Sequence, residues 1–222
     1  ETGIEQHVEK NGVLPSHILS RTFSFLRSND LIYRPAIKSY MLGETPPAFD
    51  LLYWNGDATG LPGKMTVQYL RWLCQQDQFA QSGITLFGEV LRLSDVTVPF
   101  CAVACETDHI AAWPDSYRGF TKMGSRSKTF ILSQSGHIGG IINPPSKKKY
   151  GHYTNTDMRL SHNEWQDNAA FHEGSWWSRW ESWLRKKSGK LVPAQQPGSE
   201  VFKPLCTAPG TYVLKGKSTS EK

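Results

Sequence analysis

The sequence predicts an α/β fold, because two apolar runs with the composition of buried strands flank a helix and each leads into a polar loop. The first run covers residues 96–105 and leads to Asp108, and the second covers residues 128–133 and leads to His137. Pro114 stands between them at a position typical of the first turn of a helix. Two strands joined through a helix are expected to be parallel, so their carboxyl ends meet at one edge of the sheet. We therefore expect the Asp108 carboxylate and the His137 ring to lie within or near hydrogen-bond reach.

The residues before the first run predict mostly helices and loops, followed by one hairpin. A helix is expected over 32–41, and a second, amphipathic helix over 65–76. Residues 49–54 form a short apolar piece that periodicity alone does not assign. Residues 84–93 predict a hairpin with its turn near Gly88.

The residues after the second run predict two further helices and an extended tail. Ser161 and Glu164 have the spacing of a capping box, which predicts a helix from there through Phe171. A second helix is expected from Ser175, with an apolar stripe that predicts packing in the core and consists of Trp176, Trp180, Trp183 and Leu184. From about residue 190 the chain is rich in proline and polar residues, which predicts an extended, loosely held tail.

The composition argues against several classes of protein. The apolar stretches stay well short of the about 18 residues that a membrane span needs, so no membrane-spanning helix is expected. The net charge of +5 suits an anionic partner, but the run Lys147–Lys149 is more typical of a solvated loop, and nucleic-acid binding is not supported. The 4 cysteines lack the spacing of a disulfide framework or a zinc site, which predicts buried reduced thiols in a cytosolic protein, no metal and no cofactor.

The acid and the histidine follow the order of the α/β-hydrolase fold, but the nucleophile that this order requires is missing. In that fold the nucleophile, the acid and the base follow one another along the chain, so Asp108 and His137 are candidates for the acid and the general base. The motifs Gly-x-Ser-x-Gly and Gly-x-Cys-x-Gly do not occur, and the nearest match, Gly56–Gly60, has an alanine at its centre. Taken singly, a loop aspartate is more often a turn or capping residue, and a histidine between small residues is often a plain loop residue. The spacing that pairs them favours the catalytic interpretation.

The other histidines and the strand cysteines receive structural interpretations. His109 follows Asp108 directly and cannot point the same way, so it is expected to be structural. Cys101 and Cys105 lie within the first apolar run and not at a strand-to-helix turn, so neither is expected to replace the nucleophile. Three further histidines have no partner at a useful spacing and are interpreted as surface residues: His152, His162 and His172.

Several phrases of the chain resemble the polyhydroxyalkanoate synthases, the polymerases that make storage polyesters from (R)-3-hydroxyacyl-CoA. The most specific phrases are Ser135-Gly-His-Ile-Gly-Gly-Ile-Ile-Asn-Pro-Pro145 and Gly174-Ser-Trp-Trp177, which a generic hydrolase would not share. The resemblance extends over essentially the whole chain, and its other phrases are Thr22–Leu31, Phe49–Thr59 with Leu61-Pro62, Thr107–Ile110 and Pro209–Val213. The sequence of residues 54–59 most resembles that of class I, the short-chain enzymes.

The resemblance implies an α/β-hydrolase core with a largely helical cap inserted before the acid-bearing strand. Residues 1–82 would be the later part of that cap, truncated on its N-terminal side. Residues 83–222 would be the C-terminal half of the core with its extended tail. The catalytic unit of the family is Cys–His–Asp, in which His137 would deprotonate the cysteine, and Asp108 would orient His137 and help to activate the substrate hydroxyl. The nucleophilic cysteine has no counterpart in the chain, so the chain alone is expected to be inactive.

The resemblance also implies the partners and the location of the complete enzyme. The substrate would be an (R)-3-hydroxyacyl-CoA, which an acyltransferase reaction joins into polyester with release of CoA. The site of action would be the surface of polyester granules in the cytoplasm. A homodimer through the cap is implied for the full-length protein, with no nucleic acid and no membrane span.

Two other interpretations stay open at this point. The first is an esterase or another hydrolase of the same fold. The second is a non-catalytic piece, either a dimerising cap or a protein that binds the polymer surface through exposed aromatic residues. The reading frame upstream of Glu1 separates them, since Gly-x-Cys-x-Gly favours the synthase, Gly-x-Ser-x-Gly the hydrolase and a stop codon the non-catalytic piece. The sequence leaves open the side-chain length of the substrate, the oligomeric state, and whether Glu1–Gly3 is native.

Overall fold

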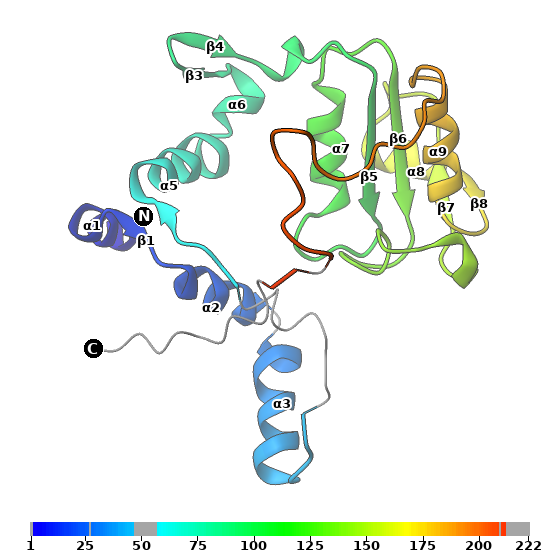
Figure 1. Ribbon diagram of the computed structural model, residues 1–222. Coiled ribbons are helices and arrows are strands. Elements are labelled where there is room, and N and C mark those ends of the chain that lie inside the picture. The colour runs from blue at the N-terminus through cyan, green and yellow to red at the C-terminus, as the bar shows by residue number, and fades with distance from the viewer. Residues whose placement is uncertain (1, 27, 47–56, 209, 212–222) are drawn as a thin grey trace. The chain divides into compact units, whose positions relative to one another are not determined.

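The computed structural model describes residues 2–26, 28–46, 57–208 and 210–211 (Figure 1). The chain divides into two compact units, one formed by residues 1–70 with 192–222 and the other by residues 71–191. The boundary expected after residue 82 falls within the second unit, and the assignment of cap and core stays a prediction. Parts of the sequence that carried interpretations lie outside the described residues, namely 49–56, 209, 212 and 213.

The second unit is built on a four-stranded sheet in the order β5-β6-β7-β8 (Figure 1). Strands β5 (Phe100–Cys105) and β6 (Lys128–Ser133) are parallel, which confirms the strand pair expected from the two apolar runs. The short strands β7 (His152–Thr154) and β8 (Ala170–His172) extend the sheet in antiparallel fashion and are not anticipated from the sequence. Among the described strands β5 lies at the edge, because it pairs with β6 alone.

The longer helices of the second unit are α7 (Trp113–Thr121), α8 (His162–Asp167) and α9 (Trp177–Arg185). Helix α7 has Pro114 in its first turn, as predicted. Helix α8 begins at the predicted capping box, where the Ser161 N–H donates to Glu164 Oε2 at 3.0 Å. The expectation that this helix continues through Phe171 is wrong. The Asn168 side chain donates to the Glu164 carbonyl at 2.8 Å and ends the helix, and Phe171 lies in β8.

Smaller elements lie before the sheet and between two of its strands. The predicted hairpin is confirmed, and Phe87 and Gly88 form its turn with φ of 51° and 87°, both in the left-handed region that two-residue hairpin turns require. The small elements are helix α6 (Gln78–Gln81), hairpin strands β3 (Ile84–Leu86) and β4 (Glu89–Leu91), and the 3₁₀ turns Leu93–Asp95 and Pro145–Lys147.

An aromatic core joins α7 and α8 to the sheet. Trp165 of α8 is fully buried, and its ring lies 5.2 Å from that of Phe130 on β6 and 5.6 Å from that of Tyr117 on α7. Burying one such side chain stabilises the fold by about 1.5–3 kcal/mol, so this cluster fixes the β5–α7–β6 unit. The expectation that the α9 stripe is core is wrong for Trp180 and Leu184, which are 41% and 40% exposed, whereas Trp176 is buried and Trp183 half-buried.

The first unit is mostly helical, as predicted. The short strands β1 (Val13–Leu14) and β2 (Leu61–Pro62) pair antiparallel, and Gly63 follows β2 directly. A Cβ on Gly63 would come within 2.1 Å of Val8 Cγ1 and 2.9 Å of the Gly12 carbonyl oxygen, so this contact requires glycine. The helices are α1 (Thr2–Asn11), α2 (Ser16–Leu26), α3 (Arg34–Ala36) and α5 (Gly63–Tyr69), with π-helical turns over Asn29–Tyr33 and Ile37–Met41. A third π-helical turn, Leu70–Gln75, begins at the boundary and belongs otherwise to the second unit.

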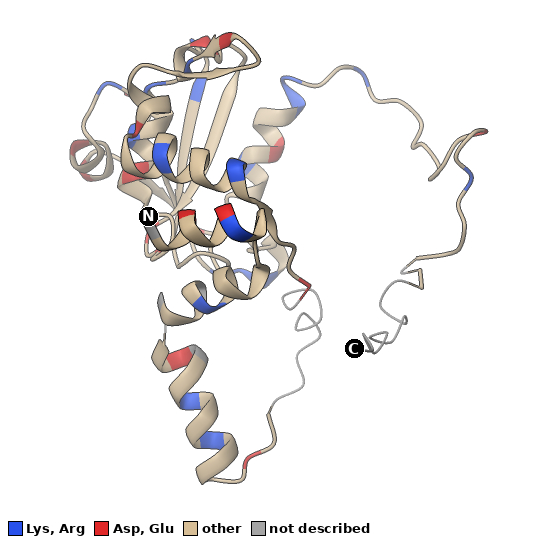
Figure 2. Ribbon diagram, turned by 90° about the vertical axis from the view of Figure 1, so that its left-hand side faces the viewer, with Lys and Arg blue, Asp and Glu red and all other residues tan. Residues whose placement is uncertain are grey.

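Figure 2 marks the positions of the charged residues along the described chain. Lys and Arg residues are scattered over helices and loops of both units (Figure 2). None of the helices in the described part of the chain combines the length and the apolar character needed to cross a bilayer. From residue 190 to the last described residue the chain forms neither helix nor strand, as expected for the tail.

Candidate functional site

Asp108 and His137 meet at one edge of the sheet. Asp108 lies 3 residues beyond the end of β5 and His137 lies 4 residues beyond the end of β6, so both follow the carboxyl ends of adjacent parallel strands. The distance between Asp108 Oδ2 and His137 Nδ1 is 2.9 Å. The expected contact between the two side chains is confirmed, whereas their catalytic roles stay predictions.

The two oxygens of the Asp108 carboxylate have different partners. Oδ1 accepts hydrogen bonds from the backbone N–H groups of Ile110 at 2.8 Å and Ala111 at 2.9 Å, and Oδ2 faces His137. The side chain is only 8% exposed. Burial disfavours ionisation of Asp108, but the hydrogen bonds from Ala111, His137 and Ile110 outweigh it, so the pKa of this carboxyl lies below its usual value. Asp108 is therefore a carboxylate at neutral pH.

The ionised carboxylate determines which nitrogen of His137 carries the proton. A carboxylate only accepts hydrogen bonds, so Nδ1 must be the donor of the 2.9 Å contact. In the neutral ring the lone pair then belongs to Nε2, which makes no hydrogen bond within the described residues. The side chain is 44% exposed, so Nε2 is accessible to a reactant. This is the tautomer that a general base in a triad requires.

Backbone hydrogen bonds tie the two loops together. The N–H of Glu106 donates to the Ser133 carbonyl at 2.8 Å, and the N–H of Thr107 donates to the Ser135 carbonyl at 3.1 Å. The loops therefore continue the β5–β6 pairing past the strand ends. The positions of Asp108 and His137 are fixed by the same ladder that builds the sheet.

Two tryptophans hold the loop that carries His137. Trp176 Nε1 donates to the Gly140 carbonyl and Trp177 Nε1 donates to the Ile141 carbonyl, each at 2.9 Å. Ser133 Oγ, at the end of β6, donates to the same Gly140 carbonyl at 2.9 Å. Three side-chain donors thus fix the carbonyls of one short segment, which limits the positions that the His137 ring can take.

Gly140 is required where this loop crosses β5. A Cβ at this position would come within 2.6 Å of Cys105 Sγ and 2.7 Å of the Gln134 carbonyl oxygen. Any larger residue would push the His137 loop away from the strand that positions Asp108. The glycines around His137 therefore permit close packing, as the sequence suggests.

The sequence interpretation did not identify Trp176 and Trp177 as supports of the site. Trp176 lies on the predicted apolar stripe and Trp177 does not, so the pattern gave neither residue a role in the site. The available signal was chemical, because a buried indole N–H needs an acceptor. The sequence could not show that the acceptors are carbonyls 36 residues earlier in the chain.

The strand cysteines lack the properties of a nucleophile. Burial raises the pKa of the Cys101 thiol, and burial together with the Asp108 charge raises that of Cys105 to about 11. All four cysteines are free, and the expectation that they are buried is wrong for Cys74 and Cys206, which are exposed. Neither strand thiol is in the thiolate form at neutral pH that attack on a thioester requires.

Thiol alkylation checks this conclusion. At pH 8 we expect iodoacetamide to modify Cys74 and Cys206 in the folded protein, while Cys105 reacts only after denaturation, because at a pKa of about 11 roughly one thiol in a thousand is ionised. Raising the pH toward 11 should increase the rate at Cys105, since it increases the thiolate fraction. Peptide mass spectrometry identifies the modified residues. Rapid modification of Cys105 at pH 8 without unfolding would contradict the expectation.

The interpretation of three histidines as surface residues is partly wrong. His152 is buried and stacks on His172 with ring centroids 5.1 Å apart, because the two residues are paired across β7 and β8. His162 lies against the Trp113 ring at 5.8 Å. His109 is exposed, and its side chain makes no hydrogen bond within the described residues, in keeping with a role outside the site.

Within the described part of the chain, no group of three or more His, Cys, Asp or Glu side chains lies close enough together to hold a metal ion. The expectations of no metal and no cofactor stay predictions.

Comparison with known proteins gives a consistent result. The chain is 39% identical over 198 residues to the poly(3-hydroxyalkanoate) polymerase subunit PhaC of Cupriavidus necator, a match that covers 88% of the chain and 33% of that protein. It is 38% identical over 211 residues to a poly(3-hydroxyalkanoate) polymerase of Methylorubrum extorquens, covering 95% of the chain and 35% of the relative. It is 37% identical over 206 residues to poly(3-hydroxyalkanoate) polymerase 2 of Ectopseudomonas oleovorans, a match that covers 92% of the chain and 37% of the relative. The chain thus spans about a third of the length of these relatives. No protein-family profile matches the chain.

Proposed function

The chain belongs to the poly(3-hydroxyalkanoate) polymerase family, and we propose that it supplies the general base and its orienting acid to an acyltransferase that joins (R)-3-hydroxyacyl units from CoA thioesters into polyester. The observation that carries the proposal is the contact between Asp108 Oδ2 and His137 Nδ1, which leaves His137 Nε2 as an accessible base. The nucleophilic cysteine would come from outside these 222 residues.

In the proposed first step His137 Nε2 takes the proton of the cysteine thiol. The thiolate sulfur attacks the carbonyl carbon of the acyl-CoA, and the bond between that carbon and the CoA sulfur breaks. The proton held by His137 passes to the departing CoA sulfur, so free CoA is released and the acyl group stays on the enzyme as a thioester. Asp108 stabilises the imidazolium that forms between these events.

In the proposed second step a hydroxyl oxygen attacks the enzyme-bound acyl group and forms the ester bond. The hydroxyl proton goes to a base, and the bond from the acyl carbon to the cysteine sulfur breaks. The resemblance implies that Asp108 takes part in activating this hydroxyl. The geometry favours an indirect part, because three hydrogen bonds already engage a carboxylate that is only 8% exposed. We propose that His137 Nε2 receives this proton as well, with Asp108 keeping the ring oriented.

The proposal is tested by comparing the chain alone with a complete polymerase that contains it. With (R)-3-hydroxybutyryl-CoA, the complete polymerase should release CoA and form polymer, whereas the 222-residue chain should release no CoA above the buffer background. A base and its orienting acid have no group to activate without the nucleophile and its oxyanion hole. Chromatography of free CoA measures both reactions, and near-UV circular dichroism verifies that the chain is folded.

Two outcomes would contradict the proposal. A folded complete polymerase that releases no CoA would refute the acyltransferase assignment. Release by the 222-residue chain that His137→Ala abolishes would show that a nucleophile lies within the chain.

We propose the remaining features of the complete enzyme on the family resemblance. The similarity of residues 54–59 to class I enzymes supports short-chain acyl groups as substrates. The surface of polyester granules in the cytoplasm is the proposed site of action, and a homodimer through the helical cap is the proposed assembly.

A further inference from the structure

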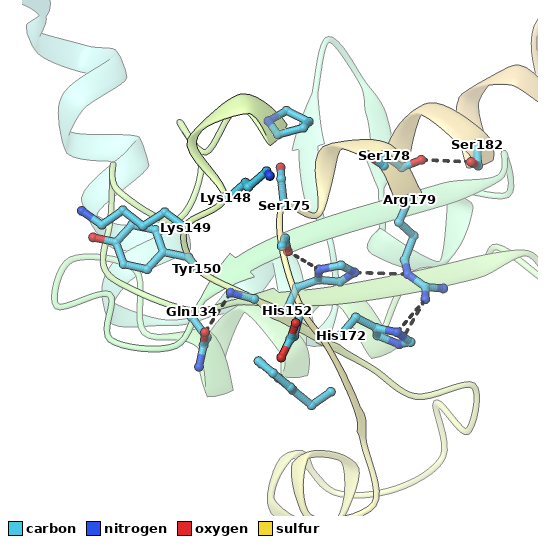
Figure 3. Close-up of a pocket in the computed structure, with 15 residues that line it drawn as sticks. Gln134, Lys148, Lys149, Tyr150, His152, His172, Ser175, Ser178, Arg179 and Ser182 are labelled. Carbon is cyan, nitrogen blue, oxygen red and sulfur yellow. Dashed lines mark hydrogen bonds between the residues drawn. The ribbon is translucent and has the colours of Figure 1, made fainter.

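An open cavity of about 900 Å³ lies in the second unit and does not include Asp108 or His137 (Figure 3). Its walls come from the loop that follows the His137 segment, from β7 and β8, and from the first turns of α9. Such a volume is within the usual range for small-molecule sites. The residues that give the cavity its charge and shape are Lys148, Lys149, His152, His172, Glu173 and Arg179.

Arg179 lines this cavity and has no carboxylate partner among the described residues. Its Nε donates to His152 Nε2 at 3.3 Å and its Nη2 contacts His172 Nε2 at 3.1 Å (Figure 3). By contrast, Arg185 on the same helix is paired with Glu181 at 2.9 Å. Arg179 is thus held in place by neutral acceptors that leave its charge unbalanced.

The two histidines are suited to be neutral acceptors. Burial lowers the pKa of His152, and so does the positive charge of Arg179. Burial and the same charge lower the pKa of His172. His152 Nδ1 lies 3.0 Å from the Gly174 carbonyl and must donate to it, so the lone pair of Nε2 faces Arg179. A guanidinium has five N–H donors, and the rings engage only part of this set.

Two lysines add to the positive charge from the opposite wall. Lys148 and Lys149 line the cavity on a loop whose course is fixed by Asn143, a buried side chain that donates to the carbonyls of Lys149 at 3.3 Å and Tyr150 at 3.0 Å. Three cationic side chains and one carboxylate, that of Glu173, therefore line the same cavity. A cavity with an oriented guanidinium and an excess of positive charge favours an anion with several oxygens.

We propose that this cavity binds the phosphate or diphosphate group of a small-molecule ligand, with Arg179 as the central contact and Lys148 and Lys149 as supporting cations. Two oxygens of a phosphate can accept parallel hydrogen bonds from the planar donor groups of a guanidinium. The group can come from a free nucleotide or from the nucleotide end of CoA. The second source rests on the proposed function, and the first does not.

The test measures binding to the full 222-residue chain by isothermal titration calorimetry at constant ionic strength. Inorganic pyrophosphate probes the anion site itself, and we expect saturable binding that Arg179→Gln weakens by about ten-fold or more, because a charge-assisted contact is lost. The double variant Lys148→Gln, Lys149→Gln should weaken binding by several-fold. Failure of pyrophosphate to bind, or equal binding by the Arg179→Gln protein, would overturn the proposal.

Matched variants distinguish the loss of a positive charge inside the cavity from the loss of the same charge elsewhere on the chain. Arg185→Gln removes the same charge from the same helix, and Lys147→Gln removes one lysine that does not line the cavity, so both should bind pyrophosphate within about two-fold of the unmodified chain. Weakening by Arg185→Gln equal to that of Arg179→Gln would refute a localised site. Should Arg179→Gln disturb the fold, as judged by near-UV circular dichroism, the double lysine variant decides, because both lysines are exposed.

Two nucleotide probes distinguish the sources of the phosphate. Tighter binding of adenosine 3′,5′-bisphosphate than of ADP supports the nucleotide end of CoA, and the reverse order supports a free nucleotide. The His137→Ala protein should bind all three probes unchanged, since His137 does not line the cavity. The proposal of an anion site and the proposal of polymerase chemistry can therefore be refuted independently of each other.

Discussion

In a complete polymerase that contains this chain, His137→Ala is expected to lower the rate of CoA release by several orders of magnitude, about 10³-fold to 10⁶-fold. In the proposed mechanism His137 Nε2 is the base next to the largely buried Asp108 carboxylate, and alanine would leave the cysteine thiol without a proton acceptor. The loss corresponds to about 4–8 kcal/mol of transition-state stabilisation. Single-turnover release of CoA from (R)-3-hydroxybutyryl-CoA measures the effect on the first chemical step.

The matched control for this variant is His109→Ala. His109 is exposed, and its side chain makes no hydrogen bond within the described residues, so the rate should stay within about two-fold of the unmodified enzyme. Because the His137 side chain is 44% exposed, its removal should leave the fold intact. A folded His137→Ala enzyme that retains a tenth of the rate would refute the general-base role.

Asp108→Asn is expected to lower the rate by about 10⁴-fold, although the change is nearly isosteric. Asparagine can still accept the backbone N–H groups of Ile110 and Ala111 through its oxygen, so the loop keeps its shape. Its amide nitrogen then faces His137 Nδ1 and donates to it. This moves the imidazole proton to Nε2, where it blocks the lone pair that must accept the thiol proton.

Nuclear magnetic resonance of the imidazole nitrogens checks the mechanism of this loss. The unmodified chain should show the proton on His137 Nδ1 and the Asp108→Asn chain should show it on Nε2. Asp115→Asn serves as the control, because that exposed carboxylate only pairs with Arg118 on the surface of α7. An Asp108→Asn enzyme with full activity would show that His137 is oriented by other contacts.

The pair of catalytic candidates and the strands that carry them could be predicted because their signals are local. The runs of β5 and β6 are continuous, apolar and bounded by polar loops, and parallel strands place their following loops at one edge. The strands β7 and β8 have three residues each, which is too short for an alternating pattern to be recognised. The stacking of His152 on His172 depends on the register between these strands and therefore could not be predicted.

The supports of the site were outside the reach of pattern analysis for a different reason. Trp176 and Trp177 have the same hydrophobic character as core residues, and the spacing of Trp176 with Trp180 indicates an ordinary apolar stripe. Their role depends on which carbonyls lie opposite the indole N–H groups, and those carbonyls belong to Gly140 and Ile141 in a distant loop. Tertiary hydrogen bonds of this kind leave no periodic trace in a sequence.

Among the described strands β5 is paired on one side only, which makes the second unit suited to complementation by an added strand. A parallel strand has its N–H and C=O groups directed alternately to its two sides, so alternate residues of β5 offer bonding groups away from β6. A peptide that docks there in parallel would end at the edge where Asp108 and His137 lie. Two separately produced polypeptides could therefore reconstitute one catalytic centre. The register between β5 and the added strand would determine the position of a nucleophile on that strand relative to Asp108 and His137.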